Sequence, residues 1–538
     1  MEFINDKYKY PSRRQVVYAK NGMVHSSAPL AAQIGIEILK KGGNAVDASV
    51  AMASALPLLE PTGNGLGADC FALIWYQGKL YGINGSGVAP KAITADLVRK
   101  AGYSEMPEEG WLSTMVPGAP SAWEKMRSRF GTLSMAQLME PAIRYAEEGF
   151  PVPETIAKQW AEEAERFHAV YADAPEAYQP WFDNFTKDGE PYKAGEIYRN
   201  PDFAKTLRSL AATNCESYYH GEIMEQIVAF SEKTGGLFSR EDFQNYDAEW
   251  VEPISACYKG YDVCEIPPNG HGITALMALN ILSGLKLEDQ RETADNYHKM
   301  IEAIKLAFVD TKKYVADARY MKTRVEDLLS DAYTEQRRQL IGDTALMPEA
   351  GDPRCGGTVY FCTADKDGNM VSFIQSNYAR FGSGIVVPGT GIALQDRAAN
   401  FSLDPESDNY LEGGKKAYHT IIPGFLMKDG KAIGPFGVMG GFMQPQGHLQ
   451  VVVNTVDFHM NPQTCLDAPR FQWCGDKKVQ LEREVDRTIA QTLADKGHQV
   501  TIVNNNIGMG RGGIIWRMEN GVYAGGTECR CDGTIAAW

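Results

Sequence analysis

The stretch from Cys355 to Gly384 constrains the fold of this chain more than any other. It contains a β-prone run from Thr358 to Thr363, a turn at Asp365 to Asn369, and a second β-prone run from Met370 to Ser376. This order predicts a β-hairpin. Two glycines stand directly before Thr358, which leaves two interpretations. Thr358 is either the ordinary first residue of a strand, or the residue before which the chain cuts itself. In the second case its own α-amine can activate a hydroxyl that is a weak nucleophile alone.

Charge and hydropathy limit the partners of the chain. Its 538 residues carry a formal net charge of −15, and no cation-rich stripe is present that would neutralise phosphates, so nucleic acid is not expected. The most apolar early stretch, Ala48 to Leu59, contains Pro57 and is too short to span a bilayer. We expect a buried helix there and no membrane partner. The N-terminal residues lack the features of a secretory signal, so a cytoplasmic location is expected.

Cysteine and histidine patterns predict neither a metal site nor a cofactor. The ten cysteines are irregularly spaced without a C-x-x-C pair, so disulfides are not expected. The nine histidines show no ligand spacing. Gly508 to Gly513 formally matches G-x-G-x-x-G, but Ile514 to Met518 after it is β-prone. A dinucleotide site needs a helix at that point, so we reject this assignment.

Helical and β-prone blocks alternate along the chain. Ser26 and Ser27 are candidate caps of a first helix that ends at Gly42-Gly43, and Asn44 begins the next one. Glu60 to Trp75 places a Gly-rich turn before an apolar strand, where the backbone can approach another segment closely. The alternation predicts a layered α/β (α+β) fold. No repeat or flexible linker divides the chain, so we expect one intertwined unit.

Taken together, the motifs of this chain resemble those of the gamma-glutamyltranspeptidase family of N-terminal-nucleophile hydrolases. The resemblance runs nearly end to end through GMVHSSAPLAAQIGIEILKKGGNAVDA, PTGNGLGADCFALI, VPGAPSAW, EEGFPV, GGLFSREDF, the Thr358 hairpin, FGSGIVVPGTGI, PGFLMKDGK and APRFQW. It implies a four-layer αββα sandwich, made as a precursor and cut into a large and a small chain. Here these would be residues 1–357 and 358–538, partners within one domain. A dimer of such heterodimers is compatible with the resemblance.

The resemblance also implies the catalytic residues. The scissile bond would join Gly357 to Thr358, and Thr358 would supply both the hydroxyl nucleophile and the basic amine. Gly440 and Gly441 match the oxyanion hole of the family, whose N–H groups stabilise the charge that develops on a carbonyl oxygen. Ser376 takes the position of a hydroxyl that supports the nucleophile.

The expected substrate pocket departs from the glutamate-binding pattern of the family. Ala95 stands where glutamate-binding members use an arginine. In the segment Gln395 to Phe401, Arg397 takes the place of a Gln or Glu, and Asn400 replaces an Asp that helps to hold the α-ammonium of glutamate. A cation therefore lies where a cation should bind, which inverts the charge preference of the pocket.

Four further positions belong to the same expected pocket. His419 and Thr420 take the places of the family's paired serines, and the family's pocket asparagine aligns with Tyr378, next to Asn377. The stretch between Phe401 and His419 is shorter than the lid loop of many relatives, so a more exposed acyl group is expected.

Three functions fit these residues. The first is a self-processing amidohydrolase that cleaves a small acyl-amide. In it Arg397 pairs with the carboxylate of a dicarboxylic acyl chain, as in the similar cephalosporin and glutaryl acylases. The alternative for Arg397 is a surface or structural ion pair. The second function is true γ-glutamyl transfer or glutathione hydrolysis, with other residues replacing the lost contacts. The third is an uncut, non-catalytic homologue, against which the retained Thr358, Ser376, Thr420 and Gly440-Gly441 speak.

Overall fold

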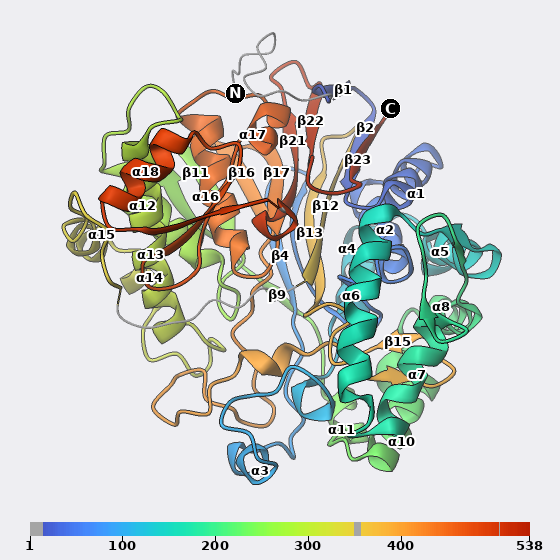
Figure 1. Ribbon diagram of the computed structural model, residues 1–538. Coiled ribbons are helices and arrows are strands. Elements are labelled where there is room, and N and C mark those ends of the chain that lie inside the picture. Colours follow the sequence, from blue (N-terminus) through green and yellow to red (C-terminus); the bar gives the residue numbers. More distant parts are fainter. Residues whose placement is uncertain (1–13, 349–356, 505) are drawn as a thin grey trace.

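Two seven-stranded sheets pack face to face at the centre of the structure (Figure 1). This computed structural model describes residues 14–348, 357–504 and 506–538, so Cys355 and Gly356 of the predicted hairpin lie outside the described residues. Sheet I contains, in spatial order, β1 (Val17–Ala19), β22 (Tyr523–Thr527), β21 (Arg511–Arg517), β17 (Lys431–Met439), β16 (Gly424–Lys428), β11 (Tyr261–Glu265) and β10 (Ile254–Tyr258). Sheet II contains β23 (Thr534–Ala537), β2 (Gly22–Ser26), β12 (Gly357–Asp365), β13 (Met370–Tyr378), β3 (Asp69–Tyr76), β4 (Lys79–Gly85) and β9 (Glu249–Val251).

Helices cover the outer face of each sheet, which gives four layers (Figure 1). Sheet II is covered by α1 (Pro29–Lys40), α2 (Ala45–Leu59) and α4 (Ala119–Phe130), with α5 (Met135–Glu148) and α8 (Pro201–Thr213) packed beyond them. Sheet I is covered by α12 (Gly272–Ser283), α13 (Ala294–Tyr314) and α16 (Met443–Val456). The predicted four-layer αββα sandwich is confirmed.

Smaller elements surround this sandwich. A three-stranded sheet of β18 (Phe471–Trp473), β19 (Lys478–Glu482) and β20 (Gln499–Val503) lies with α18 (Arg487–Asp495) beside α13. The helices α6 (Glu154–Tyr171), α7 (Pro175–Phe185) and α10 (Glu222–Thr234) lie below the first helical layer in Figure 1. None of the described helices is both long and apolar enough to cross a membrane.

The predicted hairpin forms the middle of sheet II. β12 pairs with β13 from Val359↔Gln375 to Ala364↔Met370, and the register shifts between Gly357 and Val359. On its other side β12 pairs with β2 only from Phe361 onward. Asp365 closes the turn because its carboxylate accepts the backbone N–H groups of Asp367 and Asn369. The irregular first residues of β12 leave Thr358 at the end of the sheet, where side chains can surround it.

One predicted helix cap is confirmed and one is wrong. Asn44 caps α2 in a capping box with Asp47. The first helix, in contrast, has Ala28 at its N-cap and no side-chain cap. Ser27 donates its hydroxyl to Glu60 instead. Ser27 binds the distant Glu60 rather than the N-terminus of α1 because the buried carboxylate of Glu60 needs a hydrogen-bond donor.

Both sheets combine strands from before and after residue 358. Residues up to 357 provide β2, β3, β4 and β9 to sheet II, whereas later residues provide β13, β23 and nearly all of β12. Sheet I is mixed in the same way, since β1, β10 and β11 precede residue 358 and its other strands follow. A cut before Thr358 would therefore leave two chains that share both sheets.

Candidate active site

The hydroxyl of Thr358 lies beside that of Ser376. Thr358 Oγ1 is 3.2 Å from Ser376 Oγ. Ser376 Oγ already accepts the backbone N–H of Tyr378 at 2.8 Å and Arg397 Nη2 at 3.2 Å. Either hydroxyl can be the donor in this contact. With Ser376 as the donor, the hydrogen bond would support negative charge on Thr358 Oγ1.

Arg397 hydrogen-bonds to Ser376 of this pair and to Thr420. It opens the short helix η2 (Arg397–Asn400), and its Nη1 donates to Thr420 Oγ1 at 2.7 Å. Its guanidinium lies 4.7 Å from the centre of the Tyr378 ring. Tyr378 has an unusual positive φ of 81°. Such a backbone conformation persists only where the surrounding structure stabilises it.

The guanidinium of Arg397 is buried without a carboxylate partner. Its exposed fraction is 0%, and no carboxylate of the described residues lies within 4.0 Å of it. Its Nε donates to no acceptor among the described residues. Burial lowers the pKa of Arg397 to about 10, although Asp69 and Asp396 raise it. The alternative for this residue, a surface or structural ion pair, is not seen among the described residues.

The sequence analysis missed Asp69. Of the neighbouring charged groups, Asp69 does the most to raise the pKa of Arg397. It opens β3 opposite Ser376, and its carboxylate lies 3.0 Å from His419 Nε2. The backbone N–H of Ile421 points at His419 Nδ1, so we assign the proton of His419 to Nε2. Burial lowers the pKa of His419 well below its usual value. A signal was available in the sequence, because Asp69 is the only charged residue in the apolar motif PTGNGLGADCFALI.

Titration of Asp69 falls near neutral pH. Burial raises the pKa of its carboxyl to about 7, while Arg397 and the N–H groups of Gly87 and Gly118 lower it. Burial also raises the pKa of Asp396, the residue before Arg397, to about 7. The charge around Arg397 therefore changes across the physiological range.

Gly440 and Gly441 join β17 to α16 close to Thr358. Met439, the last residue of β17, accepts the N–H of Tyr360 with its sulfur at 3.2 Å. Both glycines have positive φ, 131° and 57°, which a residue with a side chain adopts with strain. Neither of their N–H groups donates to an acceptor in the described part of the chain. Two unpaired donors just before α16, at its electropositive end, can stabilise an oxyanion.

Asn377 and Asn400 are not brought to the nucleophile. Neighbouring residues of a strand face opposite sides, so Asn377 points away from Ser376, and its amide packs against Gly65. Both amide atoms of Asn377 are buried without a partner among the described residues. Asn400 lies instead with Tyr378 and Phe442 on the wall of a pocket of about 620 Å³. Phe442, which lines this pocket, directly follows Gly441 in the chain.

The site as a whole is buried. Thr358 is 1% exposed, and Ser376 and Thr420 are 0% exposed. The expectation of a more exposed acyl group, which came from the short stretch between Phe401 and His419, concerns a bound substrate and stays a prediction.

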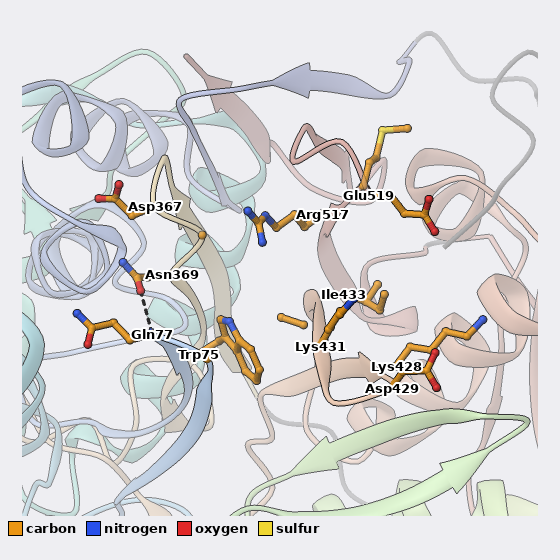
Figure 2. Close-up of a pocket in the computed structure, with 14 residues that line it drawn as sticks. Trp75, Gln77, Asp367, Asn369, Lys428, Asp429, Lys431, Ile433, Arg517 and Glu519 are labelled. Atoms are coloured by element: carbon orange, nitrogen blue, oxygen red, sulfur yellow. Dashed lines mark hydrogen bonds between the residues drawn. The ribbon is translucent and has the colours of Figure 1, made fainter.

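A second pocket lies at the opposite end of the sandwich. Figure 2 shows it between the turns that follow β3, β12, β16 and β21, with a volume of about 750 Å³. Acidic and basic side chains alternate on its walls, such as Asp367, Lys431 and Glu519. It is separated from Thr358 by the length of β12, roughly 25 Å at about 3.3 Å per residue. It has no part in the chemistry at Thr358.

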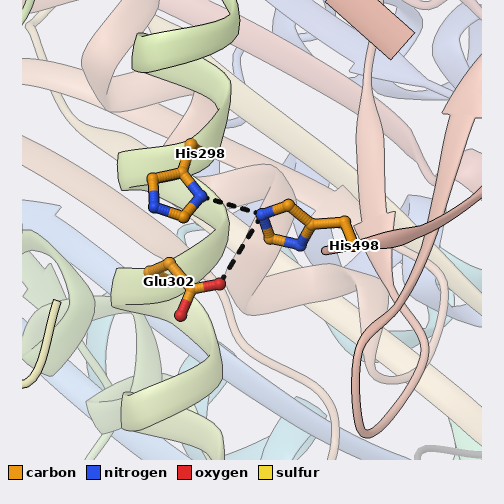
Figure 3. A group of neighbouring side chains, drawn as sticks. All are labelled: His298, Glu302 and His498. Atoms are coloured by element: carbon orange, nitrogen blue, oxygen red, sulfur yellow. Dashed lines mark hydrogen bonds and ion pairs between the residues drawn. The ribbon is translucent and has the colours of Figure 1, made fainter. Parts of the chain in front are cut away.

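One buried group of side chains has the composition of a metal site (Figure 3). The donor atoms of His298, Glu302 and His498 all lie within 4.8 Å of one another. The sequence analysis missed it because His498 follows His298 by 200 residues.

Hydrogen bonds already occupy these donors. His298 Nδ1 lies 2.8 Å from His498 Nε2, and His298 Nε2 lies 2.8 Å from the carbonyl of Gly342. Lys305 Nζ binds Glu302 at 2.7 Å and lies 3.5 Å from His498 Nδ1. A divalent cation would have to displace a proton and compete with this ammonium, so the arrangement fits a structural network better.

Comparisons with known proteins agree with the fold. The family model described as Gamma-glutamyltranspeptidase matches residues 31–538. The crystal structure of cephalosporin acylase from Bacillus halodurans is 56% identical, with a TM-score of 0.95, and covers 100% of this chain and 99% of its own. The Glutathione hydrolase-like YwrD proenzyme of Bacillus subtilis is 35% identical over 95% of this chain and 97% of its own length. The Oxamate amidohydrolase proenzyme of Klebsiella pneumoniae is 32% identical over 96% of this chain and 98% of its own length. The chain therefore belongs to the gamma-glutamyltranspeptidase family.

Proposed function

We propose that this chain is a self-processing amidohydrolase that works through an acyl-Thr358 intermediate. The observation that carries the proposal is the placement of Thr358 Oγ1 3.2 Å from the hydroxyl of Ser376, near two N–H groups that donate to no acceptor among the described residues. The names of the relatives include the word proenzyme, which supports processing. The processed chains would be residues 1–357 and 358–538.

Processing would use the same hydroxyl as turnover, before the α-amine exists as a base. Thr358 Oγ attacks the carbonyl carbon of Gly357, the C–N bond breaks as the hydroxyl proton passes to the departing nitrogen, and an ester joins the two parts. This step frees the α-amine of Thr358. Water then hydrolyses the ester, which frees the carboxylate of Gly357 and the hydroxyl of Thr358. The product holds nucleophile and base in one residue.

In turnover, the α-amine takes the proton of Thr358 Oγ as the oxygen attacks the amide carbonyl of the substrate. The N–H groups of Gly440 and Gly441 donate hydrogen bonds to the oxyanion, and the ammonium returns the proton to the leaving amine. Water, deprotonated by the same amine, cleaves the acyl ester. Acylation and deacylation each have a lower barrier than direct amide hydrolysis.

The acyl group would carry a carboxylate. Arg397 is a buried cation with unused N–H groups, separated from Thr358 Oγ1 only by Ser376. A buried cation is costly without a partner, and a carboxylate from the substrate would supply one. One relative is named for oxamate, which carries a carboxylate beside its amide, and this favours an anionic acyl group over γ-glutamyl.

Gel electrophoresis tests the proposal. Purified wild-type protein should separate into two chains under denaturing conditions, with Thr358 at the N-terminus of the smaller one. Thr358→Ala should remain a single chain with the thermal stability of a folded protein, because it lacks the attacking oxygen. A wild-type chain that stays intact and hydrolyses neither anionic nor γ-glutamyl amides would leave the non-catalytic interpretation.

A further inference from the structure

The glycine-rich segment Gly508 to Gly513, rejected as a dinucleotide site, brings a cation to Thr358. The helix that a nucleotide would need is absent at this point, since β21 begins at Arg511. Arg511 pairs with Met439 at the end of β17, next to Gly440. From there its side chain reaches toward sheet II, and Arg511 Nη2 lies 3.4 Å from the backbone carbonyl oxygen of Thr358.

A buried carboxylate holds Arg511 in this orientation. Arg511 Nη1 donates to Glu60 Oε1 at 3.0 Å, and Ser27 donates to the other oxygen of Glu60. Glu60 is the C-cap residue of α2 and is 1% exposed. Burial raises the pKa of Glu60, whereas Arg511 and Ser27 lower it. The start of β21, the end of α2 and the start of β12 thus meet at the main chain of Thr358.

Gly63 also packs against the carbonyl of Thr358. A Cβ atom added to Gly63 would lie 3.3 Å from Thr358 O and 3.3 Å from Val359 Cγ2, which is tighter than ordinary contact. The ladder register between β12 and β13 shifts at this residue. The carbonyl of Thr358 is therefore in contact with both Gly63 and the guanidinium of Arg511.

We propose that Arg511 is a positioning residue for the N-terminal nucleophile, which holds the main chain of Thr358 once the peptide bond to Gly357 is cut. This inference rests on the proposed self-processing function. Before the cut, Gly357 restrains Thr358 from the N-terminal side. After the cut that restraint is lost, and a misplacement of the nucleophile by about 1 Å can cost about 100-fold in rate.

The charge of Arg511 also acts on the new α-amine. A cation close to an ammonium favours its neutral form, which is the form that accepts a proton. Among the described residues, charged side chains near Thr358 are Arg511 on β21, Glu60 after α2, Arg397 in η2, and Asp69 two strands away on β3. Of these, Arg511 hydrogen-bonds to the backbone of Thr358.

The test compares Arg511→Gln with Arg517→Gln. Arg517 lies six residues further along the same strand, at the distant pocket of Figure 2. The wild type must first be shown to cut itself and to hydrolyse an amide, and all rates are normalised to cut chain. Arg511→Gln should lower kcat about 10- to 100-fold with KM within about twofold. The acid limb of its pH profile should move up by about one pH unit. Arg517→Gln should change neither.

Two further variants keep the inference open to refutation if Arg511→Gln does not fold. Glu60→Gln removes the anion that opposes Arg511, so the acid limb should move to lower pH. Arg511→Lys keeps the charge and should keep the acid limb near that of the wild type while kcat falls. If the acid limb of Glu60→Gln stays at the wild-type value, or if folded Arg511→Gln has wild-type kcat and pH profile, the inference is overturned. Wild-type cleavage and turnover would still stand in that case.

Discussion

Arg397 changes what the nucleophile's surroundings can bind. It donates to Ser376 and Thr420 at once, so it orders the hydroxyls while it contributes a positive charge. Lysine could supply the charge but not both bonds in one plane, because its ammonium is a point charge on a flexible stem. The side chain therefore links the chemistry at Thr358 to the choice of acyl group.

Replacement of Arg397 should separate the substrate classes. We expect the wild type to hydrolyse a glutaryl anilide faster than a γ-glutamyl anilide, and Arg397→Gln to lose most of that preference. A charge-assisted hydrogen bond contributes about 1.5–3 kcal/mol, which corresponds to roughly 10- to 150-fold in kcat/KM for the glutaryl substrate. Arg397→Lys serves as the control that keeps the charge. A γ-glutamyl preference that persists in Arg397→Gln would refute the anionic acyl group.

Asp69 should make substrate binding depend on pH. Its carboxyl, with a pKa of about 7, is neutral below that pH and leaves the charge of Arg397 less balanced. KM for an anionic amide should therefore fall as the pH drops through 7 and rise above it. Asp69→Asn should weaken this dependence, and an uncharged acyl amide should show little of it in the wild type. Equal pH dependence for both substrates would contradict the role of Asp69.

At the scale of elements, the connection between β17 and α16 determines where an oxyanion can sit. The strand ends at Met439 and the helix begins at Met443, so Gly440 and Gly441 must turn the chain within a few residues. Positive φ at both glycines directs their N–H groups away from the sheet ladder. The turn thereby presents two donors next to the end of β12.

Gly440→Ala should damage catalysis more than folding. The new Cβ would lie 3.2 Å from Gly510 Cα at a φ of 131°, so the turn must shift and its donors with it. Loss of one oxyanion donor typically costs about 10²–10³ in kcat with little change in KM. Gly430→Ala is the matched control, because it has a φ of 70° in an open turn with nothing near its Cβ. It should lose stability but keep kcat, as measured by thermal unfolding and steady-state kinetics.

At the scale of the whole molecule, shared sheets should keep the two processed chains together. β12 pairs with β2 and β13 pairs with β3 in sheet II, and β16 pairs with β11 in sheet I, so main-chain hydrogen bonds cross between the chains in both sheets. Cut protein should elute from gel filtration as one species in native buffer and separate into two chains only in denaturant. Separation under native conditions would contradict a single intertwined domain.

The sequence predicted much of the architecture. Local signals located the hairpin from Thr358, the helix start at Asn44 and the β-prone segment after Gly508 to Gly513, because turns, helix starts and strand propensity act over a few residues. The cap at Ser26 or Ser27 was wrong, since Ser27 is taken by Glu60 from the end of α2. Local sequence patterns do not show that a distant residue competes with the helix N-terminus for the same side chain.

The sequence by itself determined that this chain folds as a layered sandwich and that Thr358 begins its central hairpin. The tertiary structure decided which groups surround Thr358. Arg511 contacts it from 153 residues away in the sequence, Glu60 holds Arg511, and Asp69 lies opposite Ser376. Distance in sequence hides such contacts. The burial of Arg397 without a carboxylate partner was likewise decided by the packing of β13, η2 and β3 around it. Charge in a low-dielectric interior depends on all neighbours in space, and a linear pattern records only those in the chain.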